Sequence, residues 1–113
     1  MIYTSYFSNI KNLDIDRCVS IAIGTPQWFK GTVIKELQPT WDMVMGHKSG
    51  IFTDDDYIEM YQKNILSKID IDKFLEKYDE SILLCWCGKN KFCHRHILAE
   101  WINNYKENSI KEI

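Results

Sequence analysis

The residues best suited to chemistry gather in one short segment near the C-terminal end of the sequence, between Cys85 and His96. This segment follows an apolar stretch and leads into one with helical spacing, so a helix is expected to begin at about Cys93. A thiol at a helix start is biased toward the thiolate, because the helix dipole favours negative charge there. Cys93 is therefore a candidate nucleophile, with His94 or His96 as its general base.

The same segment suits an anionic ligand. The first N–H groups of a helix lack intrahelical partners, and Arg95 adds a guanidinium that can hold a phosphate or carboxylate through two hydrogen bonds. Cys85, Lys89 and Trp28 complete the predicted ligand contacts, the tryptophan by stacking on a base or sugar. Plainer interpretations stand beside these: Cys85 packs in a strand, Lys89 is a loop charge, Trp28 belongs to the core, and Arg95 pairs with a structural carboxylate or with backbone carbonyls.

Metal binding is an alternative for these residues. Cys85, Cys87, Cys93 and His94 are four groups of the kinds that zinc prefers. Their spacing differs from that of zinc knuckles, adjacent Cys93 and His94 are awkward as joint ligands, and Cys85 is expected to point into the sheet layer. The prediction is therefore a site without a metal or another cofactor.

Composition describes a small globular domain. The 113 residues are 45% hydrophobic and 13% aromatic, which predicts a single domain over residues 1–113 with its own core. The net charge is -2, so a basic protein that coats nucleic acid is not expected. No signal-peptide pattern and no membrane-spanning stretch is found, which predicts a cytoplasmic protein with reduced thiols and no membrane partner.

Charge is distributed unevenly along the chain. Residues 53–80 hold nine acids and four bases, whereas residues 81–113 hold fewer acids than bases. An anion would be repelled by the first region and tolerated by the second, although the acidic stretch also suits a solvated helix face.

Strands and helices are expected to alternate. Segments rich in β-branched or apolar residues predict strands over residues 2–7, 17–23 and 81–86. Helices are predicted after the N-cap residues Thr53 and Asp70, and over residues 93–105. Residues 27–50 are expected to be irregular, with a short helix near residues 33–37. The last helix has the strongest periodicity, and its predicted inward face consists of Ile97, Leu98, Trp101, Ile102 and Tyr105.

This alternation predicts an α/β fold of two or three layers with a mainly parallel sheet. Ligands of such sheets usually bind at the carboxyl ends of the strands. The loops that follow Phe7, Ile23 and Trp86 are therefore expected to surround the site.

The C-terminal third resembles domain-of-unknown-function family 488. The resemblance is carried by Leu83, Leu84 and Cys85, a short polar loop, and then Cys93, His94 and Arg95 opening a helix with Ala99, Glu100 and Trp101. Residues 2–4 and 20–26 also look like family positions. The resemblance implies a compact α/β domain found mostly in bacteria and their phages, and it implies no established activity. Cys87 departs from the family pattern, as do Ile23 and Gly24, where relatives often carry an arginine.

These observations predict a protein that binds a phosphorylated or other anionic ligand, such as a nucleotide or nucleic acid, at the start of the last helix, with catalysis by the cysteine–histidine cluster. One alternative is a non-catalytic module that binds nucleic acid or a protein. Another is a structural domain in which His94 and Arg95 only organise the helix start. A free sheet edge in so small a domain leaves room for a homodimer.

Overall fold

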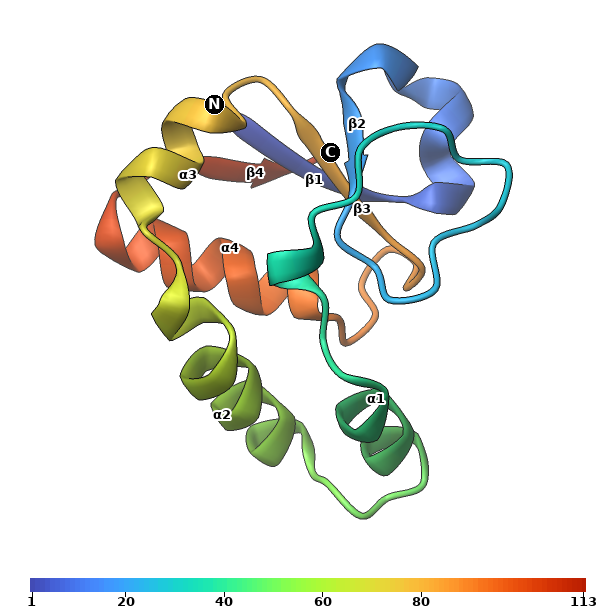
Figure 1. Cartoon of the computed structure of the whole chain (residues 1–113), viewed down its shortest axis with the longest axis vertical. Coiled ribbons are helices and arrows are strands. Elements are labelled where there is room, and N and C mark those ends of the chain that lie inside the picture. Colours follow the sequence, from blue (N-terminus) through green and yellow to red (C-terminus); the bar gives the residue numbers. More distant parts are fainter.

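The computed structural model describes residues 1–113 and confirms an α/β fold with a wholly parallel sheet (Figure 1). The sheet has the order β2-β3-β1-β4, and its strands are β1 (Ile2–Tyr6), β2 (Cys18–Ser20), β3 (Ile82–Cys85) and β4 (Ile110–Glu112). The α-helices are α1 (Trp41–Lys48), α2 (Asp54–Asn64), α3 (Ile71–Lys77) and α4 (His94–Tyr105). Four short 3-10 turns join them, at Phe7–Asn12, Ile15–Arg17, Lys35–Leu37 and Leu66–Lys68.

The central strand of the site is β3, which is buried along its whole length. It pairs with β1 through Tyr6 and Cys85 at its carboxyl end, and with β2 on the other side. A backbone bond from Ile21 N–H to the Leu84 carbonyl (3.0 Å) extends the second pairing past β2. Because these strands are parallel, their carboxyl ends meet at one edge of the sheet.

Two predicted N-caps are confirmed. The Thr53 hydroxyl accepts a hydrogen bond from Asp56 N–H (3.1 Å), and the Asp56 carboxylate accepts one from Thr53 N–H (3.0 Å), which forms a capping box at the start of α2. The Asp70 carboxylate accepts from Lys73 N–H (3.2 Å) and begins α3.

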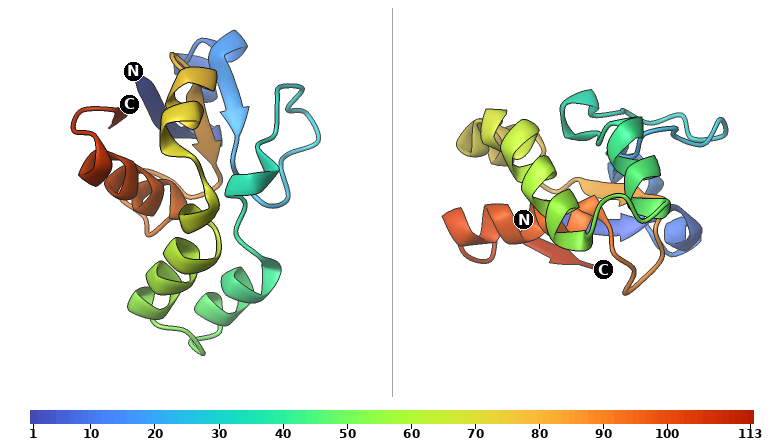
Figure 2. Two further views of the ribbon diagram at one scale, coloured as in Figure 1. Left: turned by 60° about the vertical axis from the view of Figure 1, so that its left-hand side comes forward. Right: turned by 90° about the horizontal axis from the view of Figure 1, so that it is seen from below.

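Helix α1 corrects the prediction of an irregular segment over residues 27–50. Thr40 caps it by accepting from Met43 N–H (3.1 Å). The sequence pattern does not predict this helix, because its apolar residues do not form one stripe. Trp41 and Met45 are exposed, while Gly46 is buried against the ring of Phe52. Helices α1 and α2 pack together beyond the carboxyl ends of β2 and β3 (Figures 1 and 2).

The other corrections are smaller. The second strand is three residues long rather than seven, because a 3-10 turn ends at Arg17 just before it and the chain leaves β3 after the bond from Ile21 N–H. Strand β4 was not predicted, because three residues alternating with charge give little signal. Tyr105 was expected to face inward, but it is 58% exposed and its hydroxyl donates to Asp72 (2.8 Å).

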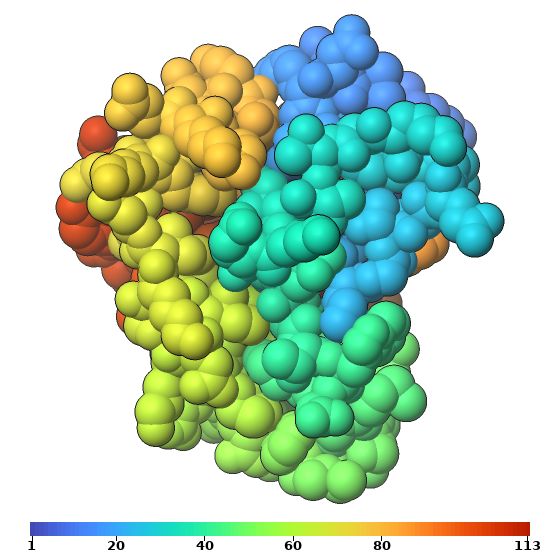
Figure 3. Space-filling model, viewed as in Figure 1, coloured from blue at the N-terminus to red at the C-terminus, as the bar shows by residue number.

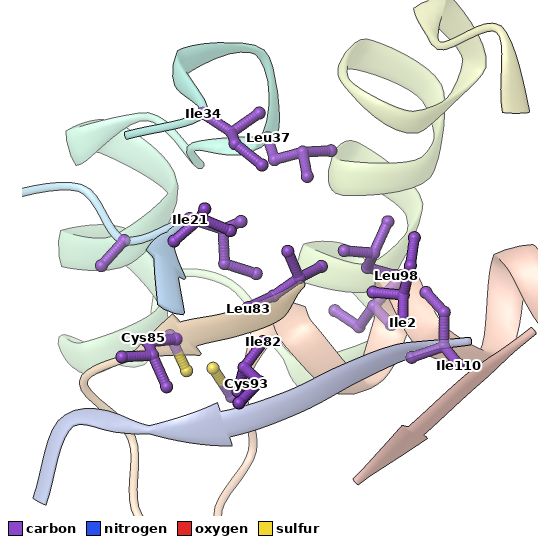
Figure 4. Packing of buried hydrophobic residues seen from close by; sticks show 14 of the residues in the cluster. Ile2, Ile21, Ile34, Leu37, Ile82, Leu83, Cys85, Cys93, Leu98 and Ile110 are labelled. Carbon is purple, nitrogen blue, oxygen red and sulfur yellow. The ribbon is translucent and has the colours of Figure 1, made fainter. Parts of the chain in front are cut away.

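The core lies between the sheet and the helices that pack on it. Helix α4 contacts β3, β4 and α2. Figure 4 shows core residues from several of these elements, including Ile2, Leu83, Leu98 and Ile110. No helix is long and apolar enough to cross a membrane.

Candidate functional site

The cysteine-rich segment forms a tight connection from strand to helix at the carboxyl edge of the sheet. Cys85 is the last residue of β3, and Cys93 is the N-cap residue of α4. The chain between them turns back on itself through a backbone bond from Lys91 N–H to the Gly88 carbonyl (3.3 Å), with Asn90 at a positive φ of 64°. The seven intervening residues therefore bring the two ends of the segment together.

Three thiols meet in this connection. The sulfur atoms of Cys85, Cys87 and Cys93 all lie within 4.8 Å of one another. Cys85 and Cys93 are buried and Cys87 is half-buried, and no disulfide joins them. Figure 4 shows the sulfurs of Cys85 and Cys93 turned toward each other at the edge of the core.

Arg95 holds this connection in place from within the fold. Its side chain is fully buried, with 0% exposed. The Nη1 atom donates to the Cys85 sulfur (2.9 Å) and the Cys87 carbonyl (2.5 Å), while Nη2 donates to the Gly88 carbonyl (3.0 Å). Nε and Nη2 also bond the Glu112 carboxylate of β4 at 3.0–3.2 Å.

All five N–H groups of the guanidinium are thus engaged by protein atoms. The guanidinium therefore has no free N–H group for the predicted ligand anion. Arg95 instead follows the plainer interpretation, because it pairs with a structural carboxylate and with backbone carbonyls. Its role in the site is to fix the positions of Cys85 and Cys87.

His94 points the other way from Arg95, toward β2. Its Nε2 lies 2.8 Å from the Ile21 carbonyl oxygen. A carbonyl only accepts, so Nε2 carries the proton and Nδ1 keeps its lone pair. That Nδ1 lies 3.7 Å from the Cys93 sulfur. Burial lowers the pKa of His94 to about 4, so the imidazole is neutral near pH 7.

The three thiols titrate as one group. The neighbouring sulfurs of Cys85 and Cys93 lower the pKa of Cys87. The contact with Cys87 and burial raise the pKa of Cys85, and the contacts with Cys85 and Cys87 together with burial raise the pKa of Cys93. The trio therefore favours the thiolate form at Cys87, the most exposed of its three cysteines.

A cavity of about 410 Å³ opens beside the trio. Its wall includes all three cysteines of the trio and His94, together with residues from the segment between β2 and α1, from α1, from α2 and from the loop after β3. They are Ala22, Ile23, Gly24, Pro39, Trp41, Val44, His47, Lys48, Tyr57, Trp86 and Phe92. Figure 3 shows how the chain between β2 and α2 covers the front of the molecule.

Two tryptophans flank the cavity at Gly24. Trp86 donates from Nε1 to the Gly24 carbonyl (2.7 Å), and the ring of Trp41 packs so closely that a Cβ on Gly24 would lie 3.2 Å from it. Both indoles remain more than half exposed, at 54% and 57%. An exposed pair of rings beside an apolar cavity is a feature of ligand-binding surfaces.

Two basic residues at the cavity, His47 and Lys48, come from α1. His47 lies 2.6 Å from the Asp54 carboxylate and stacks on Phe92, with ring centroids 4.6 Å apart. Lys48 makes no ion pair. No carboxylate lines the cavity, and Lys48 is its one lysine or arginine.

The arrangement admits two kinds of chemistry. Cys93 and His94 form a thiol–imidazole pair in which Nδ1 can accept the thiol proton. The three thiols are also the ligand type that soft metal ions prefer.

Comparison with known proteins identifies the family. A family model named DUF488-N3a and described as the active DUF488-N3 subclade matches residues 13–106. The chain belongs to this family. The match confirms the resemblance to family 488 and covers both β2 and the whole cysteine segment. No curated protein and no solved structure matches the chain.

Within this DUF488-N3a domain, the predicted site residues divide into two groups. Cys85, Cys93 and His94 come together on the cavity wall. Trp28 and Lys89 do not line the cavity: Trp28 packs edge-on against Phe7 and is 54% exposed. His96 lies in a neighbouring hollow of about 340 Å³ that shares Phe92 and Cys93 with the main cavity, and its buried Nε2 has no partner.

Sequence reasoning missed several residues of this DUF488-N3a cavity. Trp41 and Lys48 lie on the unpredicted helix α1, and Tyr57 lies on α2, where its spacing identified it only as core. Trp86 was assigned to the third strand, but it opens the loop that follows. The signal that could have identified Trp86 is its position, because loops that follow parallel strands are expected to surround the site.

Proposed function

We propose that this protein is a cysteine-dependent enzyme that acts on a small ligand held in the cavity beside the thiol trio. One observation carries this proposal: three thiols and a neutral imidazole meet on the wall of one cavity at the carboxyl edge of a parallel sheet. Reactive groups that share a cavity with apolar and aromatic walls are the usual arrangement of an enzyme site.

The walls favour a ligand with a flat ring and a negative group. Trp41, Trp86 and Tyr57 supply aromatic surface, against which a heterocycle gains stacking contacts. Lys48 supplies the positive charge, and no carboxylate opposes it. A nucleotide or another phosphorylated ring compound has both features. Arg95, whose donors are all engaged, takes no part in this contact.

The cysteine trio supplies the reactive group in this proposal. Cys87 is the most exposed of the three, and the two neighbouring sulfurs lower its pKa. The lone pair of His94 Nδ1 is placed to accept a proton from Cys93. Arg95 acts as a positioning residue, because it ties the loop that carries Cys87 to the start of α4.

The test combines ligand binding with product analysis. The reduced protein is screened by thermal shift against nucleotides, phosphorylated ring compounds, inorganic phosphate and short oligonucleotides. A ligand at about 100 times its dissociation constant adds about 2.7 kcal/mol of stability. The binding compounds are then incubated with the protein and examined by mass spectrometry. We expect a phosphorylated ring compound to stabilise the protein and to be converted, and the Cys93→Ser variant to bind without conversion.

Two lysines form a matched pair of controls. Lys48→Ala should weaken binding of the phosphorylated compound about tenfold, because it removes the positive charge of the cavity. Lys89→Ala should leave the affinity unchanged, since Lys89 is exposed and lies outside the cavity. Equal losses in both variants, or none in either, would count against the cavity as the ligand site.

Stabilisation by oligonucleotides alone would favour the non-catalytic nucleic-acid module instead. The specific feature for that alternative is the pair of exposed indoles of Trp28 and Trp86, which both pack against the buried ring of Phe7 at centroid distances of 6.0 and 5.3 Å. Binding through such a platform would weaken steeply with salt and would be lost in Trp28→Ala.

A further inference from the structure

The number of thiols at the site exceeds what thiol chemistry needs. A nucleophile requires one cysteine and a reversible disulfide requires two. Here Cys85, Cys87 and Cys93 converge from a strand end, a loop and a helix start, with every pair of sulfurs within 4.8 Å. Three converging sulfurs are the pattern of a site for a thiophilic metal ion.

We propose that Cys85, Cys87 and Cys93 together bind one Zn²⁺ ion as thiolates and leave the fourth coordination position open to the cavity. The ion would be the cofactor of the site described above, with the three thiolates acting as its ligands and the ion taking the place of a free thiol as the reactive centre. The use of the open position rests on the proposed function, whereas the binding of the ion does not.

The spacing of the sulfurs fits such an ion. In a tetrahedral site with Zn–S bonds of about 2.3 Å, the thiolate sulfurs stand about 3.8 Å apart. The trio lies within 4.8 Å, so small side-chain adjustments close it around an ion. The objection from sequence spacing does not hold in the folded chain, because the turn at Gly88 and Asn90 brings Cys87 back toward Cys93.

The charges around the trio also fit. Three thiolates and one divalent ion carry a net charge of -1, which an adjacent cation stabilises in a buried site. Arg95 provides one positive charge, with Nη1 at 2.9 Å from the Cys85 sulfur. N–H groups that donate to coordinating sulfurs are the usual outer layer of a metal–thiolate site. Glu112 fixes the guanidinium from the far side.

The open position faces the ligand cavity. All three cysteines line the cavity, so an ion among them has the cavity on its remaining side. Three protein ligands with a free fourth position are the arrangement of catalytic zinc sites, whereas structural sites are closed by a fourth side chain. His94, whose Nδ1 lone pair lies 3.7 Å from the Cys93 sulfur, stands beside the ion as a proton acceptor for a bound water or ligand.

Metal titration tests the proposal directly. The reduced, metal-free protein is titrated with Zn²⁺ in competition with a chromophoric chelator, and Co²⁺ is used as a spectroscopic substitute. We expect one ion per chain, with thiolate-to-cobalt charge-transfer bands whose intensity corresponds to three thiolates and d–d bands of a four-coordinate ion. Bound Zn²⁺ should protect three thiols from alkylation and leave the fourth, Cys18, with its metal-free rate.

Serine variants of single cysteines assign the ligands. Cys85→Ser, Cys87→Ser and Cys93→Ser should each weaken Zn²⁺ binding about 100-fold or more. Cys18→Ser is the matched control, because Cys18 is buried like Cys85 and Cys93 but lies at the start of β2, where its thiol donates to the Asp14 carbonyl (3.4 Å). Its affinity for Zn²⁺ should equal that of the wild type.

Three results would overturn the proposal: no ion bound to the reduced wild type, a Co²⁺ spectrum without three thiolates, or an intramolecular disulfide within the trio in place of metal. If a serine variant fails to fold, the wild-type spectrum and alkylation pattern still decide. The proposed function is judged separately, since Lys48→Ala should lose ligand affinity while keeping full metal content. Ligand conversion by the metal-free protein would support the proposed enzyme activity and would show that the ion is not its cofactor.

Discussion

His94 and Arg95 are neighbours in the sequence, yet their side chains serve two different regions of the molecule. Arg95 enters a packed interior network, where Glu112, two loop carbonyls and the Cys85 sulfur occupy its guanidinium. His94 turns to the cavity wall, where one nitrogen is bonded to Ile21 and the other faces Cys93. Successive residues of a helix point about 100° apart, so a cluster in sequence is divided between two environments.

The comparison also separates two kinds of positive charge. Arg95 is fully buried and its hydrogen bonds are all to protein atoms, so its charge holds the cysteine-rich loop in place. Lys48 is exposed at the cavity, has no ion pair, and is available to a ligand. A cation near a reactive cysteine is therefore not evidence of anion binding until its donors have been accounted for.

The largest effect should come from breaking the interior network. Arg95→Ala leaves two carbonyls and a thiol without their donor and leaves Glu112 with the Thr4 hydroxyl alone, and removal of one partner from a buried ion pair costs about 3–5 kcal/mol. We expect the free energy of unfolding in urea to fall by this amount. Lys111→Ala, an exposed neighbour of Glu112 on β4, should change it by less than about 0.5 kcal/mol. An Arg95→Ala protein of normal stability that no longer binds anions would restore the ligand role predicted from sequence.

The fold was more predictable than the use of each residue. Periodic apolar spacing and the caps Thr53 and Asp70 are local signals, so α2, α3 and α4 could be placed from sequence. Helix α1 could not, because its apolar residues serve the cavity rim as well as the core. The parallel sheet followed from the alternation of elements, and β4 was too short to leave a pattern.

The candidate site was located from sequence, but its internal arrangement was not. A strand that ends in Cys85 and a helix that begins after Cys93 predict a site at the edge of the sheet. Whether Arg95 faces a ligand depends on Glu112, which lies on the unpredicted strand β4. Whether the sulfurs meet depends on a loop turn with a positive φ at Asn90. Both are long-range or conformational features that residue spacing does not encode.

A second, smaller effect should come from the cavity side of the comparison. His94→Leu removes the N–H that donates to the Ile21 carbonyl and leaves that acceptor unpaired in the interior, which costs about 1–3 kcal/mol. We expect this loss in urea unfolding, together with loss of ligand conversion by the folded protein. His96→Leu is the control, because His96 lies outside the main cavity and its Nε2 has no partner to lose. Equal loss of conversion in the two variants would mean that His94 has no special role.

The smallest effect should come from the rim of the cavity at Gly24. This residue has a φ of 70°, which favours glycine, and a Cβ would lie 3.2 Å from the Trp41 ring. Gly24→Ala should lower the free energy of unfolding by about 1 kcal/mol and should displace Trp41 from the cavity wall. Gly50→Ala separates the two causes, because Gly50 also has a positive φ (82°) but no atom within 4 Å of the added Cβ. If Trp41 contacts the ligand, Gly24→Ala will weaken ligand binding and Gly50→Ala will not, although both variants lose comparable stability. Equal ligand affinity in the two variants would place the ligand away from Trp41 and leave Trp86 and Tyr57 as the aromatic walls that it contacts.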